Sequence, residues 1–138
     1  MNLALPYPPS VKHYWRHYRG RTVISRDGRR FREDICDLLA TSSQRSGNGP
    51  RKPPSGGRIA LAMDAFPPDR RRRDLDNLLK STQDALAHAG IYEDDSQIDL
   101  LVTRRREVVG GGHVEIQLDE LPLQRCLLCG APLIAENN

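Results

Sequence analysis

The sequence lacks any apolar run long enough to cross a membrane, and it contains few cysteines. A spanning helix needs an uninterrupted apolar stretch of roughly 18 residues or more, which is absent here, and the opening MNLALPYPPS lacks the features of a secretory leader. Cys36, Cys126 and Cys129 are too few and too unevenly placed for a disulfide scaffold. We therefore expect a cytoplasmic protein with reduced thiols.

The charges are distributed unevenly along the 138 residues. Residues 1–60 hold 12 Lys and Arg against 4 Asp and Glu, whereas residues 61–138 hold 9 against 14. A basic half favours a polyanion as partner, and acidic residues in the other half are what a cation site beside that polyanion requires. A solvated surface of uneven charge explains the same counts equally well.

The spacing of apolar residues predicts six elements in one domain. They are, in chain order, a strand at 2–7, a helix at 27–44 with its apolar stripe on Phe31, Ile35, Leu38 and Leu39, a half-buried strand at 59–65, a helix at 75–89, and two strands at 98–102 and 114–118. The last two strands, separated by three consecutive glycines, predict a β-hairpin. This order predicts an α+β fold in which a single mixed sheet of about four strands is covered by two main helices.

Two other segments have no such periodicity. Residues 11–26 mix aromatic and basic side chains, which is typical of a nucleic-acid surface, because rings stack on bases while guanidinium groups bind phosphates. The candidate DNA-binding residues here are Lys12, Arg16, Arg19 and Arg21. Tyr14 and Trp15 fit core packing equally well. Residues 45–57, rich in Gly, Pro and Ser, predict a flexible loop.

The most informative segment combines arginines with carboxylates. Four arginines, Arg70, Arg71, Arg72 and Arg73, directly precede Asp74 and Asp76. In an extended segment these two aspartates point the same way, so both can reach one cation at a junction between strand and helix. Asp95, and with less support Asp94, joins them if the chain folds back after the second helix. Mg²⁺ takes oxygen ligands of this kind, with Mn²⁺ as an alternative ion.

Each of these residues also has a plainer interpretation. Asp74 or Asp76 can serve as a helix N-cap, Asp94 and Asp95 as turn residues, and the arginines as a solvated, ion-paired surface.

Lys80 lies four residues after Asp76 on one helix face, where its ammonium is placed to contact a phosphate or a developing negative charge.

The segment PDRRRRDLDNLLKSTQDALAHAGIYEDDSQI, together with LPYPPSVKHYWRHYRGRTVIS, resembles the RusA-type Holliday junction resolvases, small phage-associated bacterial endodeoxyribonucleases. The resemblance spans about residues 3–120. It implies a nuclease domain at 1–120 whose metal-binding positions are Asp74, Asp76 and Asp95 and whose active-site lysine is Lys80. It also implies a homodimer that nicks opposing strands of a four-way DNA junction symmetrically, in recombination and repair.

The tail at 121–138 departs from that family. Its Cys126 and Cys129 form a single CxxC pair, whereas tetrahedral Zn²⁺ needs four ligands. A zinc site would require the same pair from a partner subunit, or His113 and one further group. The sequence therefore favours reduced thiols that bind no zinc.

Three functional hypotheses remain. The leading one is a Mg²⁺-dependent nuclease that leaves 5′-phosphate and 3′-hydroxyl ends. The second is a non-catalytic junction-binding or regulatory module with the same basic surface. The third is a zinc-stabilised interaction protein centred on the tail.

Overall fold

The computed structural model describes residues 1–46 and 56–133. Its central sheet has four strands, β1 (Asn2–Pro6), β4 (Ile59–Phe66), β5 (Ile98–Arg105) and β6 (His113–Glu120). They lie in the order β1-β6-β4-β5. β4 and β5 run parallel, and the other neighbours are antiparallel. The predicted single mixed sheet is confirmed, while nine residues of the predicted loop at 45–57, from 47 to 55, lie outside the described residues.

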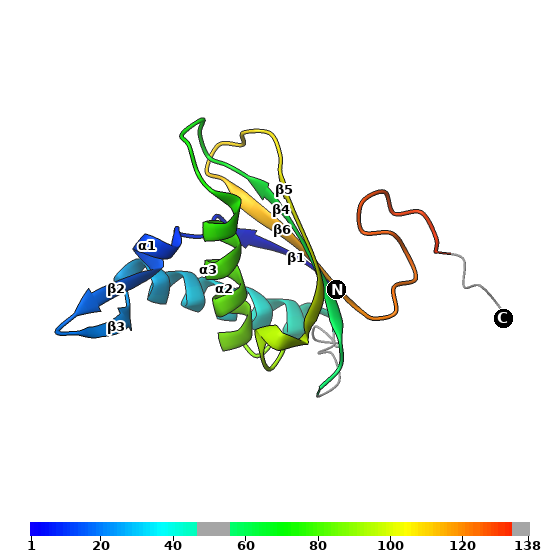
Figure 1. The fold of residues 1–138 in the computed structure, drawn as a ribbon, viewed down its shortest axis with the longest axis horizontal. Helices are drawn as coiled ribbons and strands as arrows, with labels where there is room; N and C mark the ends of the chain where they lie inside the picture. The colour runs from blue at the N-terminus through cyan, green and yellow to red at the C-terminus, as the bar shows by residue number, and fades with distance from the viewer. Residues whose placement is uncertain (47–55, 134–138) are drawn as a thin grey trace.

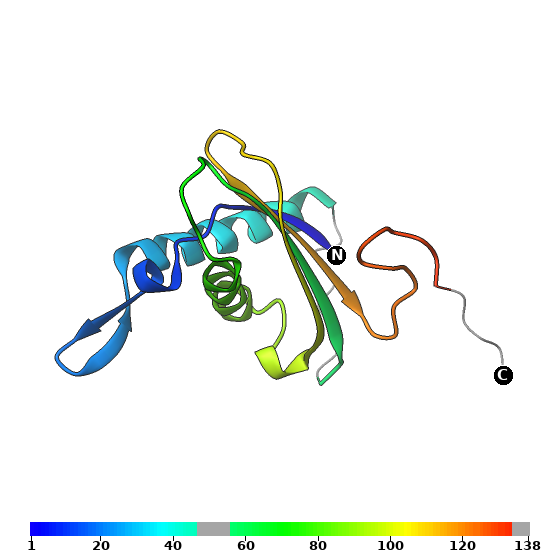
Figure 2. The same ribbon diagram turned by 45° about the horizontal axis from the view of Figure 1, so that its top comes forward.

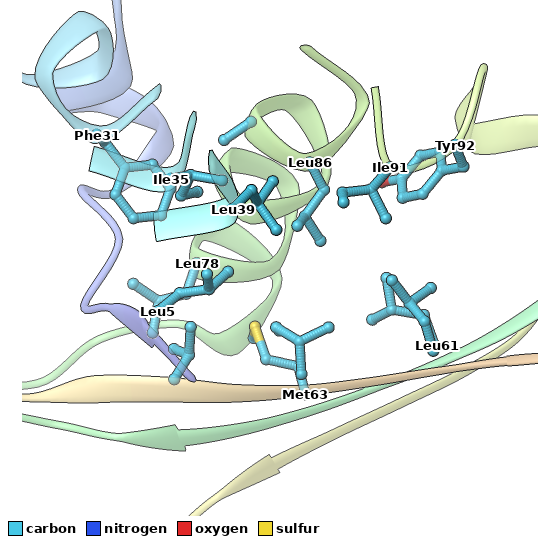
Figure 3. Packing of buried hydrophobic residues seen from close by; sticks show 14 of the residues in the cluster. Leu5, Phe31, Ile35, Leu39, Leu61, Met63, Leu78, Leu86, Ile91 and Tyr92 are labelled. Carbon is cyan, nitrogen blue, oxygen red and sulfur yellow. The ribbon is translucent and has the colours of Figure 1, made fainter. Parts of the chain in front are cut away.

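Two helices, α2 (Arg26–Ser46) and α3 (Leu75–His88), cover one face of this sheet (Figure 1). Figure 3 shows Ile35 and Leu39 of α2 and Leu86 of α3 directed toward Met63 on the sheet. All four are buried members of one apolar cluster. Burial of each such side chain stabilises the folded state by about 1.5–3 kcal/mol. This cluster therefore holds α3 against the sheet.

The apolar stripe of α2 is narrower than its sequence predicts. Phe31, Ile35 and Leu39 follow a spacing of four and are buried, whereas Leu38 is 42% exposed. Neighbouring helical residues point about 100° apart, so Leu38 cannot share the face that Leu39 turns toward the sheet. The assignment of Leu38 to the core is wrong.

β4 is buried on both faces, so the prediction of a half-buried strand is also wrong. Its Leu61 and Met63 face the helices. Ala60 and Ala62 point to the opposite face, where Leu127 of the tail packs against them. The sequence showed the alternation, but it did not show that a later segment covers the second face.

The predicted β-hairpin of the last two strands is likewise wrong. β5 and β6 lie on opposite sides of β4 and do not pair with each other. The chain between them passes over the end of β4, where the Val109 amide donates to the carbonyl of Pro67 at 2.9 Å. Because proline lacks an amide proton, the two prolines at 67 and 68 end the strand and leave room for this crossing.

Residues 11–24, which the apolar spacing left unassigned, form a short helix α1 (Val11–Tyr14) and a two-stranded ribbon, β2 (Trp15–Tyr18) and β3 (Arg21–Ile24). Figures 1 and 2 both show this ribbon projecting from one end of the molecule, with the C-terminal tail at the other. A 3₁₀ turn, η1 (Asp95–Gln97), precedes β5. Within the described residues no helix is both long and apolar enough to span a membrane.

Gly28 in α2 lies against the base of the ribbon. A Cβ at this position would come within 2.5 Å of the Tyr14 carbonyl oxygen. That carbonyl also accepts the Ser25 amide at 2.9 Å, so it is not free to move.

We therefore expect Gly28→Ala to destabilise the protein by about 1–3 kcal/mol, although alanine normally favours a helix. Urea denaturation measures the change. Gly110→Ala, where an added Cβ meets nothing within 4 Å, is the matched control. Equal stability of the two variants would contradict this packing.

Candidate active site

α3 begins at the rim of the sheet, directly after the arginine segment, and its first residues carry two carboxylates. Asp74 occupies the N-cap position with extended backbone angles, but its side chain makes no capping hydrogen bond. It accepts instead from the Asn77 side-chain amide at 3.4 Å. Asp76 lies in the first turn, and both aspartates are exposed. Asp74 therefore occupies the N-cap position of α3, as one interpretation of the sequence expected, but its carboxylate does not cap the helix.

Lys80 lies one turn further along α3 and joins two other carboxylates. Its Nζ donates to Asp84 Oδ1 at 2.7 Å and to Asp95 Oδ2 at 2.9 Å. These hydrogen bonds, that of Asp84 foremost, raise the pKa of Lys80 to about 12. Lys80 is therefore an ammonium at neutral pH, held between a helix and the turn after it.

Each of those carboxylates is held by an aromatic side chain. The Trp15 indole Nε1 donates to Asp84 Oδ2 at 3.4 Å. The Tyr92 hydroxyl lies 3.3 Å from Asp95 Oδ1 and 3.0 Å from the Gln83 carbonyl oxygen. Burial first, and then the charge of Asp95, raises the pKa of Tyr92, so the phenol keeps its proton.

Asp84, Trp15 and Tyr92 were not among the predicted site residues. The spacing of four between Lys80 and Asp84 was the one signal in the sequence for Asp84. Trp15, which had two equal interpretations, is half-buried and bonded to Asp84, whereas Tyr14 is fully buried in the core.

Asp94 has a local structural role. It is the N-cap of η1, and its Oδ1 accepts the Ser96 amide at 2.8 Å in a capping box that Gln97 completes. Hydrogen bonds from the Ser96 side chain and backbone lower the pKa of Asp94. Its side chain is thus already engaged beside Asp95.

The predicted acidic residues lie at the start of α3 and on the turn after it, but they do not form one coordination shell. Asp76 lies one turn before Lys80, about 6 Å along the helix axis, whereas the Lys80 ammonium binds Asp84 and Asp95. Within residues 1–46 and 56–133, no group of three or more His, Cys, Asp and Glu side chains is arranged to hold a metal ion. The position between Asp84 and Asp95 is taken by the Lys80 ammonium.

The four arginines before α3 divide into two kinds. Arg73 pairs with Asp69 at 2.6 Å and lies over the Tyr7 ring, and Arg71 Nε approaches the same carboxylate at 3.3 Å. Arg70 and Arg72 are exposed and have no carboxylate partner among the described residues. We call the carboxylates of Asp74, Asp76, Asp84 and Asp95 the acidic edge. Two guanidinium groups just before it in the chain are therefore available for an anion.

The ribbon of β2 and β3 gathers further basic side chains. Arg16 and Arg19 both lie over the exposed Tyr18 ring, at 5.7 and 5.3 Å from its centroid. Arg21 pairs with Tyr18 across the ribbon, and Lys12 on α1 is exposed. Trp15 at the base of this ribbon bonds to Asp84, so the basic ribbon and the acidic edge are directly connected.

A small α+β domain that places a basic ribbon beside an acidic helix edge has the layout of a protein that acts on a polyanion. Residues 6–119 match the model of the family described as Endodeoxyribonuclease RusA, and the chain belongs to this family. The expectation from the sequence motifs is confirmed.

Curated relatives cover most of the chain. It is 36% identical over 120 residues to the crossover junction endodeoxyribonuclease of Enterobacteria phage 82, which covers 87% of this chain and 94% of the relative. The corresponding protein of phage HK97 is 38% identical over 118 residues, covering 86% and 92%. That of Escherichia coli K12 is 34% identical over 120 residues, covering 87% and 94%.

The bridge that Lys80 forms between Asp84 and Asp95 predicts how the Lys80 ammonium titrates in metal-free protein. Because the pKa of Lys80 is raised, its pairing contributes fully to folding stability below the ordinary lysine pKa of 10.5. This contribution to stability is lost as pH rises through about 12. We expect Asp84→Asn to lower the pKa of Lys80 toward 10.5, because Asp84 is the largest cause of the shift. NMR of the Lys80 side chain measures it. Asp37→Asn on the exposed face of α2 is the control, and an identical Lys80 pKa in both variants would contradict the bridge.

Proposed function

We propose that this protein is a Mg²⁺-dependent endodeoxyribonuclease that resolves four-way DNA junctions in the cytoplasm of a bacterial host. The observation that carries the proposal is the Lys80 ammonium between Asp84 and Asp95, on the acidic edge of a chain of the RusA family. The names of its relatives, crossover junction endodeoxyribonucleases, supply the substrate class.

Asp74, Asp76 and Asp95 are the proposed metal-binding residues. Their donor atoms fit, because hard cations take carboxylate oxygens and the Asp74 and Asp76 carboxylates are exposed. Asp95 is held in place by Tyr92 and by Lys80, whose ammonium balances its charge. When bound, the ion supplies a Lewis acid that lowers the pKa of water and stabilises the departing 3′ oxygen.

The protein's own residues position the phosphate. Arg70 and Arg72 are exposed beside the first turn of α3, where bidentate guanidinium contacts hold phosphate oxygens. Lys80 keeps its proton, so it contributes positive charge near the scissile phosphate and does not act as a base. Trp15 and Tyr92 keep Asp84 and Asp95 oriented.

The β2–β3 ribbon is the proposed contact to a DNA arm. Its arginines and the Tyr18 ring are exposed, and the ribbon itself projects from the body of the protein (Figure 2). We propose that Arg16, Arg19, Arg21 and Lys12 hold backbone phosphates, which positions the junction without reading its sequence. A homodimer completes the proposal, since a two-fold junction offers two equivalent phosphates to two identical sites.

Asp76→Asn and Asp95→Asn are expected to reduce Mg²⁺-dependent nicking of a mobile four-way junction by at least a hundredfold. Each change removes a charged ligand oxygen and leaves the basic surface intact. Junction affinity in EDTA, measured by fluorescence anisotropy, is expected to stay within about threefold of wild type. Asp37→Asn serves as the control, because this exposed aspartate lies on α2, away from the acidic edge.

Two outcomes would contradict the nuclease proposal. One is a wild-type protein that never nicks the junction with Mg²⁺ or Mn²⁺ but binds it tightly, which is the result that a non-catalytic binding module predicts. The other is full nicking by Asp95→Asn.

Replacing Arg19 or Arg21 with alanine is expected to weaken junction binding equally for all sequences. Each lost phosphate contact should reduce the slope of log affinity against log salt by about 0.9. Arg58→Ala is the control. Arg58 directly precedes β4 and is also exposed, but it lies outside the ribbon and is paired with Asp99 of β5. A salt slope unchanged in Arg19→Ala and Arg21→Ala would show that the ribbon does not contact DNA.

A further inference from the structure

The tail after β6 contains a feature that the proposed function does not use. It lies outside residues 6–119, which match the family. Residues 124–133 fold into a small loop whose two arms bond to each other. Leu133 donates to the Gln124 carbonyl at 2.9 Å, Cys126 donates to the Ala131 carbonyl at 2.8 Å, and Arg125 and Pro132 form an antiparallel bridge.

The CxxC pair forms the tip of this loop. The Gly130 amide donates to the Cys126 carbonyl at 2.8 Å, and Gly130 has a positive φ of 72°, which a residue with a Cβ rarely adopts. The turn therefore places both cysteines at the tip of the loop.

The loop is fixed to the body of the protein. Leu127 is 6% exposed and packs on Ala60 and Ala62. Arg104 donates to the Leu128 carbonyl at 3.2 Å. Cys129 is exposed and Cys126 is partly exposed, so the sulfurs remain accessible on a docked segment.

No second pair of ligands is available among residues 1–46 and 56–133. His113 pairs with Phe66, four residues beyond Ala62 on β4 and therefore about 13 Å from the place where Leu127 docks. Cys36 lies on α2, in the layer on the opposite face of the sheet. No other side chains of the described residues join the two cysteines in a group of three or more metal-binding groups.

We propose that Cys126 and Cys129 are half of a zinc site, completed by the same two cysteines of a second copy of this chain. Four thiolates in a tetrahedron are a standard structural zinc shell, and one CxxC from each copy supplies them. Each of the four thiols gives up its proton to solvent as its sulfur binds the ion. The centre then carries two negative charges, and Arg125, bonded to the Gly130 carbonyl at 3.0 Å, holds a cation beside it in each copy.

The sequence alone favoured non-ligating thiols, because one CxxC supplies two ligands. The structure adds two observations that free thiols do not require. One is the turn that Gly130 closes at the tip of the loop, and the other is the docking of the loop by Leu127. The proposal does not depend on the nuclease function, since zinc is measured without DNA.

The test uses the full chain, purified without a metal-affinity tag, loaded with Zn²⁺ and desalted. Wild type and Cys36→Ser are expected to retain about 0.5 zinc per chain, because four thiolates fill the shell, while Cys126→Ser and Cys129→Ser retain less than a tenth of that. Native mass spectrometry should find the zinc on species of two chains. Zinc on single chains, one zinc per chain, or none at all would overturn the proposal.

A thiol count on wild-type protein avoids any effect of the variants on folding. In the zinc-loaded protein one thiol, that of Cys36, is expected to react rapidly with a disulfide reagent, and a strong chelator should release the other two. Three fast thiols before chelation would overturn the site. One reactive thiol before and after chelation would also overturn it, because it would show a disulfide between Cys126 and Cys129.

Discussion

The pairing of the Lys80 ammonium with Asp84 and Asp95 joins two segments that the chain separates by a helix end and a turn. It brings Asp95 to the side of α3 on which Asp76 lies one turn away. The turn at η1 is also held by its own capping box, by the Gln97 side chain bonded to the Gly57 carbonyl, and by Tyr92. Lys80 adds the contact that ties the Asp95 carboxylate to α3.

The fold makes that pairing geometrically accessible. β4, α3 and β5 form a parallel crossover, so the chain leaves the sheet at one end of β4 and returns beside the other. The buried stripe of α3 packs on β4 and leaves the opposite stripe, with Lys80, facing out. The basic ribbon joins the same edge through Trp15 and Asp84. Packing of one helix thereby sets the spacing between cationic and acidic groups.

Local patterns predicted the two main helices and the four strands of the central sheet, but not which strands are neighbours, and they missed α1 and the β2–β3 ribbon. The helical spacing of Leu75, Leu78 and Leu86 located α3, and Gly90 marked its end, because these signals act within a few residues. The pairing of β5 and β6 with β4 depends on contacts between residues roughly forty to sixty positions apart, and the sequence carried no signal that excluded a hairpin. The site shows the same limit: Asp74, Asp76, Lys80 and Asp95 stood out through motif and spacing. Asp84 and Tyr92 matter through their three-dimensional contacts.

We propose that the acidic edge holds a divalent ion, with Asp95 shared between Lys80 and the metal. Anomalous diffraction from crystals grown with Mn²⁺ tests this site. One or more manganese peaks are expected within coordination distance of Asp95 and of Asp74 or Asp76. An empty edge at millimolar Mn²⁺, with Lys80 still bonded to both Asp84 and Asp95, would contradict it.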